Sequence, residues 1–102
     1  MRMLVFFDLP VKTKEQRRRA TAFRTFLLKD GYHMVQYSTY ARVCNGLGAV
    51  EKHEKRLMNA VPCNGSVRLL IVTEKQYENI RILVGERVPE EKSPADEQLT
   101  FF

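Results

Sequence analysis

Residues 1–10 have the sequence MRMLVFFDLP. The apolar run Arg2–Leu9 is rich in Leu, Val and Phe, and it ends at Pro10, which cannot donate a hydrogen bond to a sheet ladder. This pattern predicts a buried strand. Asp8 interrupts the apolar run at its carboxyl end, so the strand presents one carboxylate at the point where the chain leaves the sheet.

A helix is expected after this strand. Thr13 and Gln16 have the spacing of a capping box, and Asp30-Gly31 supplies a stop. The later elements are a strand with period-two alternation, a weaker helix that ends at Pro62, a third strand, a polar connector and a last short strand. The expected ranges are 14–30 for the first helix, 32–43 for the second strand, 66–73 for the third strand, 74–79 for the connector and 80–84 for the last strand.

We assign these elements to the βαββαβ order of the ferredoxin-like sandwich, an α+β fold. Its first and third strands lie side by side in the middle of an antiparallel sheet, and both helices cover one face. The domain is expected to span residues 1–86, followed by a tail over residues 87–102. The tail ends in Leu99-Thr100-Phe101-Phe102, which we interpret as a short strand that adds to an exposed sheet edge of a dimer mate or of another protein; disorder is the alternative.

The strands predicted to be central are apolar on both faces. Leu4 and Phe6 point one way while Val5 and Phe7 point the other, and the strand over residues 66–73 alternates in the same manner. Two helices can bury only one face, and each exposed aliphatic or aromatic side chain costs about 1.5–3 kcal/mol relative to burial. We therefore predict a homodimer packed sheet against sheet.

Charge is distributed unevenly along the 102 residues. The chain has 17 Lys and Arg against 12 Asp and Glu, a formal net charge of +5. Residues 1–43 carry nine cations and three acids, residues 44–88 carry seven and five, and residues 89–102 carry one and four. A basic front with an acidic tail indicates a polyanionic partner for the body of the domain; ordinary solubilising charge is the alternative.

Asp8 is the candidate metal-binding and catalytic residue. On a two-fold dimer the Asp8 carboxylates of both chains would meet, and they would repel unless one is protonated or a divalent ion binds between them. Oxygen ligands suit Mg²⁺, with Mn²⁺ as a second choice. Such an ion would polarise a phosphodiester and activate a bound water. The alternative is that Asp8 is a turn or cap residue before the helix.

Basic side chains crowd the first two turns of the predicted first helix. The helix dipole disfavours positive charge there but favours a bound anion. We therefore predict contact with nucleic acid, against the alternative of a solvated helix face. The candidate nucleic-acid-binding residues are Lys12, Lys14, Arg17, Arg18, Arg19 and Arg24.

Other patterns exclude several classes of protein. Cys44 and Cys63 cannot form a disulfide framework and have no metal-binding spacing, and no Ser-His-Asp or Cys-His catalytic set can be assembled. The four tyrosines are expected in the core or in interfaces rather than as base-stacking platforms. No apolar run is long enough to span a membrane and no signal peptide is evident, so we expect a cytoplasmic protein without a membrane partner.

Several of these motifs, taken in order, resemble the CRISPR-associated protein two family. The motifs are Phe7-Asp8-Leu9-Pro10, Arg17-Arg18-Arg19, Asp30-Gly31 and Gln36-Tyr37-Ser38-Thr39-Tyr40. The resemblance covers residue 1 to about residue 85. It implies a ferredoxin-like homodimer in which Asp8 is the metal-binding aspartate shared across the dimer.

The resemblance implies two kinds of function. Members are described as Mg²⁺-dependent endoribonucleases, and also as scaffolds that hold duplex DNA between dimers of the large integrase subunit during spacer acquisition. One carboxylate per chain with no evident general base is a sparse active site, so the sequence favours the scaffold. The alternatives are a toxin-type, metal-dependent ribonuclease that acts alone on single-stranded RNA, and a ferredoxin-like regulatory module that binds a small ligand.

Overall fold

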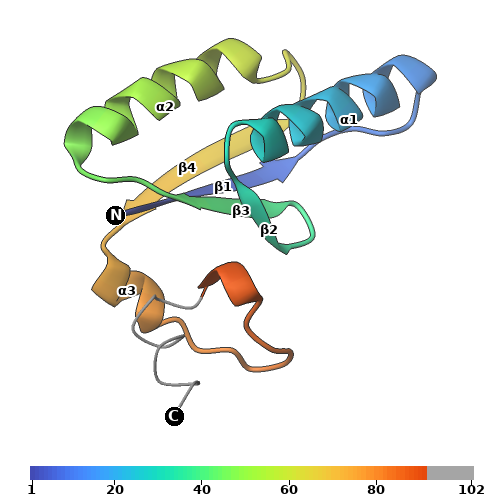
Figure 1. Ribbon diagram of the computed structural model, residues 1–102. Coiled ribbons are helices and arrows are strands. Elements are labelled where there is room, and N and C mark those ends of the chain that lie inside the picture. The colour runs from blue at the N-terminus through green and yellow to red at the C-terminus, as the bar shows by residue number, and fades with distance from the viewer. Residues whose placement is uncertain (92–102) are drawn as a thin grey trace.

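The computed structural model describes residues 1–91 and centres on a four-stranded antiparallel sheet with the strand order β2-β3-β1-β4. The elements in chain order are β1 (Arg2–Asp8), α1 (Lys14–Lys29), β2 (His33–Gln36), β3 (Thr39–Val43), α2 (Leu47–Ala60), β4 (Ser66–Val72), α3 (Glu74–Glu78) and a 3-10 helix (Pro89–Glu91). Helices α1 and α2 both lie on one face of the sheet (Figure 1). The predicted ferredoxin-like α+β fold is therefore confirmed.

The ranges expected from the sequence run strand, helix, strand, helix, strand, strand, so they do not themselves give the βαββαβ order assigned to them. The structure has that order because residues 32–43 form a hairpin. Residues 32–43 do not form one strand; β2 and β3 are joined by a turn at Tyr37 and Ser38, and Ser38 has a φ of 63°. The strand predicted over residues 80–84 is wrong, because these residues form no strand. Instead, a capping box at Thr73 starts α3 within the expected connector and takes the chain out of the sheet.

The position of β4 also differs from the prediction. β1 is central and pairs with β3 on one side and with β4 on the other, from Arg2 opposite Val72 to Asp8 opposite Ser66. Within the described sheet β4 is an edge strand, whereas residues 66–73 were expected in the middle. In a split βαβ unit the hairpin strand is inserted between the two parallel strands, so β3 takes the central place.

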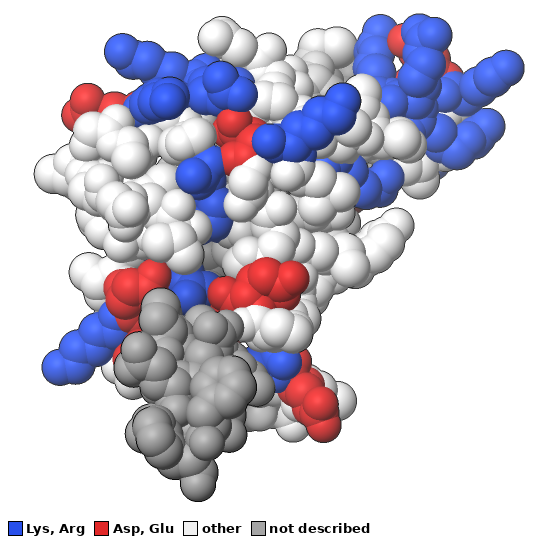
Figure 2. All heavy atoms as spheres, in the orientation of Figure 1, with Lys and Arg blue, Asp and Glu red and all other residues white. Residues whose placement is uncertain are grey.

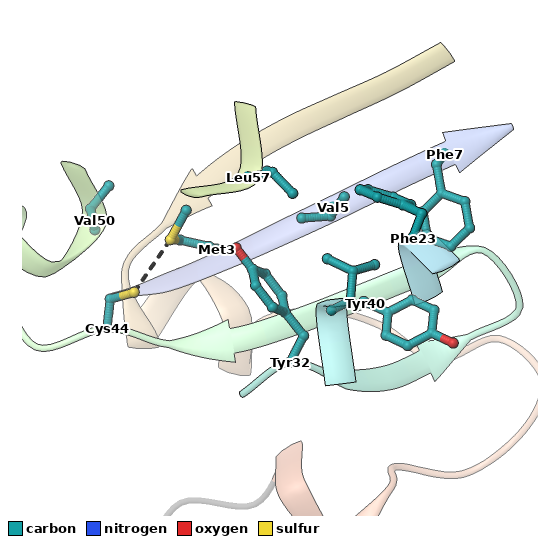
Figure 3. Packing of buried hydrophobic residues seen from close by; sticks show 10 residues of the cluster. Met3, Val5, Phe7, Phe23, Tyr32, Tyr40, Cys44, Val50 and Leu57 are labelled. Atoms are coloured by element: carbon teal, nitrogen blue, oxygen red, sulfur yellow. Dashed lines mark hydrogen bonds between the residues drawn. The ribbon is translucent and has the colours of Figure 1, made fainter. Parts of the chain in front are cut away.

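The core lies between the sheet and helices α1 and α2 (Figure 3). Alternate residues of β1 point into it, and Phe7 is 7% exposed. Its ring meets Phe23 of α1 edge-on, with ring centroids 5.3 Å apart, and stacks against Tyr40 of β3 at 5.6 Å. These contacts hold the carboxyl end of β1, which carries Asp8, against both neighbouring elements.

Both ends of α1 are fixed by side chains. The Thr13 hydroxyl accepts a hydrogen bond from the Gln16 N–H at 3.1 Å, and the Gln16 side chain accepts one from the Thr13 N–H, so the predicted capping box is confirmed. At the other end the buried carboxylate of Asp30 accepts from Arg56 Nε at 2.6 Å and lies 3.1 Å from His53 Nδ1. Asp30 thus ties the end of α1 to α2.

The face of the sheet opposite α1 and α2 is partly covered by the chain itself (Figure 1). Tyr77 of α3 packs with Leu4 and Ala41, and its hydroxyl donates to Glu91 Oε2 at 2.5 Å. The Arg2 guanidinium lies 4.3 Å from the centroid of the Tyr77 ring and donates to the Glu91 carbonyl at 3.4 Å. Residues 73–91 therefore close over the Arg2 end of β1.

Apolar surface remains exposed toward the other end of this face. Phe6 is 38% exposed and Leu70 is 50% exposed, and Leu83 in the following segment is 90% exposed. The homodimer stays a prediction, with a smaller surface to cover than the strand pattern indicated. The division at residues 86 and 87 also stays a prediction, and the edge strand expected in the tail lies outside the described residues.

No helix within residues 1–91 is both long enough and apolar enough to cross a bilayer.

Candidate nucleic-acid interface and metal site

Asp8 is the last residue of β1, and its side chain lies on the sheet face opposite α1 and α2. The alternation of the strand puts it on the same side as Leu4 and Phe6. Asp8 is exposed and forms no ion pair with any residue in the range 1–91. The N-cap of α1 is Thr13, so Asp8 is not used as the helix cap and its carboxylate is free to meet a ligand.

A shallow hollow of about 280 Å³ surrounds the Asp8 side chain. The register of β1 and β4 sets Ser66 opposite Asp8 and Arg68 opposite Phe6. The hollow thus combines a carboxylate, which attracts a cation, with a guanidinium and hydroxyls, which suit a phosphate. Its lining residues are Phe6, Phe7, Asp8, Ser38, Thr39, Ser66 and Arg68.

Arg68 is a functional candidate that sequence reasoning missed. It lies on the exposed side of β4, one position along the same face from Leu70. Arg68 shares its strand face with the apolar residues Leu70 and Val72, and a guanidinium there is a signal because Arg is rarely buried without a partner. The signal points to the Asp8 hollow only when the pairing of β4 with the end of β1 is known, because that pairing places Arg68 there.

One hydrogen bond and one close approach of the backbone flank the Asp8 segment. The Phe7 N–H donates to the carbonyl of Ser38 in the hairpin turn at 3.1 Å. On the other side, Gly65 has a φ of +91°, and a Cβ atom built there would lie 2.6 Å from the Asp8 carbonyl oxygen. The turn before β4 therefore needs glycine for its conformation and for its close approach to Asp8.

The donor chemistry at Asp8 fits a hard divalent cation in part. Mg²⁺ takes oxygen ligands and keeps several of its waters, so one carboxylate can contribute to such a site. Residues 1–91 contain no group of three or more His, Cys, Asp or Glu side chains placed to share an ion. A metal site at Asp8 therefore requires further ligands, which a second Asp8 would supply.

The basic side chains predicted to bind nucleic acid gather around the first turns of α1 and its entry loop. Figure 2 shows this concentration of Lys and Arg at one end of the molecule. All five cations between residues 12 and 19 are exposed, and α1 begins beside them with its unpaired N–H groups. The cluster comprises Lys12, Lys14, Arg17, Arg18 and Arg19.

The cations of this cluster differ in their local partners. The Glu15 carboxylate forms ion pairs with Arg18 at 2.6 Å and with Arg19 at 3.3 Å. The hydrogen bond from Arg18 lowers the pKa of the Glu15 carboxyl. Arg17 donates to the carbonyls of the entry loop at 3.2 Å. Lys12 and Lys14 form no ion pair within the described residues, so they are the cations most available to phosphates.

Arg24, the sixth predicted residue, is partly buried and lies apart from this cluster, farther along α1. Its guanidinium carbon lies 6.0 Å from the centroid of the Tyr37 ring in the hairpin turn. The structure therefore brings the first five cations together and places Arg24 beside an aromatic side chain. Tyr37 is 80% exposed, unlike Tyr32, Tyr40 and Tyr77, which are buried as expected.

The basic cluster and Asp8 are at the same end of the sheet but not on the same side. The chain passes from Asp8 through Pro10 into α1, which lies over the helix-covered face (Figure 1). The Asp8 side chain points to the opposite face. Within one chain the Asp8 side chain and helix α1 therefore lie on opposite faces of the sheet.

Comparison with known proteins identifies the family of this chain. A model of the family described as CRISPR associated protein Cas2 matches residues 1–80. A CRISPR-associated endoribonuclease Cas2 from Acidovorax ebreus is 52% identical over 102 residues and covers 100% of both chains. One from Ligilactobacillus salivarius is 42% identical over 94% of this chain and 95% of its own.

The fold also has a counterpart among solved structures. The crystal structure of Streptococcus pyogenes Cas2 at pH 6.5 superposes with a TM-score of 0.63 at 19% identity, covering 82% of this chain and 100% of that one. The family model covers most of the chain, and a relative is 52% identical over its full length. The chain therefore belongs to the CRISPR-associated protein Cas2 family.

Proposed function

We propose that this chain is a subunit of the CRISPR adaptation complex that binds duplex DNA and bridges integrase subunits during spacer acquisition. The observation that carries the proposal is the exposed basic cluster around the start of α1, where five cations accompany one carboxylate. Positive charge at a helix N-terminus is unfavourable for the helix itself but favourable for bound phosphates. Asp8 is the one acid among the residues that line the hollow described above, and such a sparse set of groups favours a binding role over a catalytic one.

The proposed working unit is a homodimer packed through the open sheet face. Phe6 and Leu70 remain exposed there, beside a groove of about 600 Å³ between the sheet and residues 80–86. Burying such side chains gains about 1.5–3 kcal/mol each, which supports a second copy as the cover. The same arrangement would bring the two Asp8 carboxylates toward each other.

A second candidate function is Mg²⁺-dependent cleavage of RNA or DNA at Asp8. The relatives carry the name endoribonuclease, and the hollow at Asp8 contains the Arg68 guanidinium in addition to the carboxylate. A divalent ion held between two Asp8 carboxylates would polarise a phosphodiester there. Arg68 and the hydroxyls of Ser38 and Ser66 would orient the phosphate.

The binding proposal is tested by the salt dependence of duplex DNA affinity. Duplex affinity falls as salt is added, and the double variant Lys12→Gln with Lys14→Gln should make this fall less steep. The slope of the logarithm of the binding constant against the logarithm of the salt concentration should decrease in magnitude by about 2, because each lost phosphate contact removes about 0.9. The matched control is Lys52→Gln with Lys55→Gln, two exposed lysines on α2. Equal slopes and affinities for both double variants and the wild type would refute the assignment of the α1 cluster.

The catalytic alternative is tested with Asp8→Asn, which removes the carboxylate charge and keeps the shape of the side chain. If the chain acts as a scaffold, the variant retains duplex binding and supports spacer acquisition with its integrase partner. The catalytic function requires that purified protein cleaves nucleic acid in a Mg²⁺-dependent manner and that Asp8→Asn abolishes this cleavage. If Asp8→Asn also abolishes spacer acquisition while the complex still assembles, the catalytic function is the physiological one.

A further inference from the structure

Tyr37 is an aromatic side chain held in the open at the tip of the β2–β3 hairpin. It is 80% exposed, although most of a tyrosine side chain is apolar and gains from burial. A single exposed aromatic is common on protein surfaces, so exposure by itself implies no function. Two further features, the backbone conformation of the hairpin and the neighbouring Arg24, distinguish Tyr37 from an ordinary exposed aromatic residue.

A bulge in β2 directs Tyr37 toward α1. The pairing of β2 with β3 shifts register between Met34 and Gln36, so Val35 is an extra residue and both Val35 and Gln36 lie on the open face of the sheet. The next residue, Tyr37, is thereby turned to the helix side. Without the bulge, the alternation would place Tyr37 on the face that carries Val35.

The hairpin tip that carries Tyr37 is well anchored. Ser38 has a φ of 63°, a left-handed conformation that is uncommon for residues other than glycine. Its carbonyl accepts the hydrogen bond from the Phe7 N–H at 3.1 Å, so the tip is joined to the central strand. The backbone that carries the exposed ring is therefore fixed, so ligand binding there costs little additional ordering of the backbone.

Arg24 extends the basic surface of α1 to this ring. Its guanidinium carbon lies 6.0 Å from the Tyr37 ring centroid, within the range of a cation–π contact. Arg24 is seven residues after Arg17, so the two lie on the same side of α1 about 10 Å apart along its axis. A nucleic-acid strand bound at the start of α1 can therefore reach Tyr37 within a few nucleotides.

We infer that Tyr37 and Arg24 form a stacking site for an unpaired nucleobase, in which the ring stacks on the base and the guanidinium binds the adjoining phosphate. This inference rests on the proposed nucleic-acid binding and adds to it a preference for DNA with a single-stranded end. Bases inside a duplex are already stacked on both sides, whereas an unpaired base has a free face. The charged side chains on this side of α1, Arg17 and Arg24, are both cations, which suits a phosphate backbone better than an apolar protein surface.

The test compares blunt duplex DNA with the same duplex carrying a short single-stranded tail that contains 2-aminopurine. Wild-type protein should bind the tailed duplex more tightly and quench the 2-aminopurine fluorescence. Tyr37→Ala should lose about 5- to 150-fold in affinity for the tailed duplex, the range for stacking on one base, with an unchanged salt slope and little loss on the blunt duplex. Tyr37→Phe should retain the wild-type affinity.

Arg24→Gln should behave differently, because it removes a charge as well as a contact. Its salt slope should fall by about 0.7 on the tailed duplex, the value for one phosphate contact in a single strand. Leu47→Ala, at an exposed position on α2, is the control for removing an exposed apolar side chain and should bind like the wild type. Circular dichroism should show that all variants are folded.

Two results would overturn the inference while leaving the proposed function intact. In the first, Tyr37→Ala binds the tailed duplex as tightly as the wild type does. In the second, Tyr37→Ala retains DNA affinity but no longer assembles with the integrase subunit, which would identify the ring as a protein contact. If the wild type binds neither duplex, the proposed function and this inference fail together.

Discussion

Gly65→Ala provides a test of the geometry at the end of β1. Gly65 has a φ of +91°, and a Cβ atom there would lie 2.6 Å from the Asp8 carbonyl oxygen and 3.1 Å from Pro10 Cδ. Neither contact can be relieved by rotating a side chain, because one atom belongs to the backbone and the other to a proline ring. The Asp8 segment or the turn would have to move.

The magnitude follows from a comparison with Gly85. Gly85 has a φ of +106° with no atom within 4 Å of an added Cβ, so Gly85→Ala measures the conformational term without a clash. That term is about 1–2 kcal/mol for a left-handed residue, partly offset by about 0.4–1 kcal/mol from the restricted unfolded chain. Gly65→Ala adds a steric cost of about 1–3 kcal/mol, as for overpacked sites.

The assay is urea unfolding of both variants and the wild type at one fixed protein concentration, because dimerisation would make the midpoint depend on concentration. Gly65→Ala should be less stable than Gly85→Ala by about 1–3 kcal/mol. Amide hydrogen exchange in Gly65→Ala should be faster at the β1–β4 pairs next to Asp8 than at those next to Arg2. Equal unfolding midpoints for the two variants would refute the close approach of Gly65 to Asp8.

Two further predictions concern the buried contacts that hold the helices and the C-terminal segment. Burial by itself would raise the pKa of Asp30, but hydrogen bonds from His53 and Arg56 outweigh it and lower the pKa from its ordinary value of 3.8. A carboxyl whose pKa is lower in the folded state than in the unfolded state stabilises the fold at pH values above its unfolded-state pKa. This stabilisation is lost as the pH falls through its folded-state pKa. The wild type should therefore lose more stability than Asp30→Asn below about pH 5, in unfolding midpoints measured across that range; parallel pH curves would contradict this. Tyr77→Phe should cost about 1–3 kcal/mol in the free energy of unfolding, because the buried Glu91 loses its 2.5 Å donor, whereas Tyr37→Phe, at an exposed ring, should be neutral.

The parts of the fold that the sequence predicts well are those set by local chemistry. The apolar run that ends at Pro10 is β1, and the Thr13 and Gln16 pair is the start of α1. Each of these signals acts within a few residues, so it does not depend on what the distant chain does. The position of Asp8 at the end of this strand is predicted for the same reason, whereas its role as a site residue stays a prediction.

The features that the sequence does not predict depend on pairing between distant segments. Alternation over residues 32–43 suggests one strand because the bulge at Val35 and the turn at Ser38 interrupt the pairing without interrupting the apolar pattern. Residues 80–84 are apolar except for Arg81 and resemble a strand, yet the capping box at Thr73 starts a helix that takes the chain out of the sheet before them. Arg68 joins the Asp8 hollow through the β1–β4 register, which no local pattern reveals.

The placement of Asp8 bears directly on whether this chain would cut a nucleic acid bound at the basic cluster. The basic cluster lies on the helix side of the domain, whereas the Asp8 side chain lies on the opposite face of the sheet. The Asp8 carboxylate therefore points away from the face that carries α1, and a duplex held by Lys12 and Lys14 need not contact it. Binding and any cleavage should respond to different substitutions, so Lys12→Gln with Lys14→Gln weakens duplex binding and Asp8→Asn leaves it unchanged. If Asp8→Asn instead weakened duplex binding as much as the lysine variant does, the two surfaces would have to act as one, and the separation inferred from the strand alternation would be wrong.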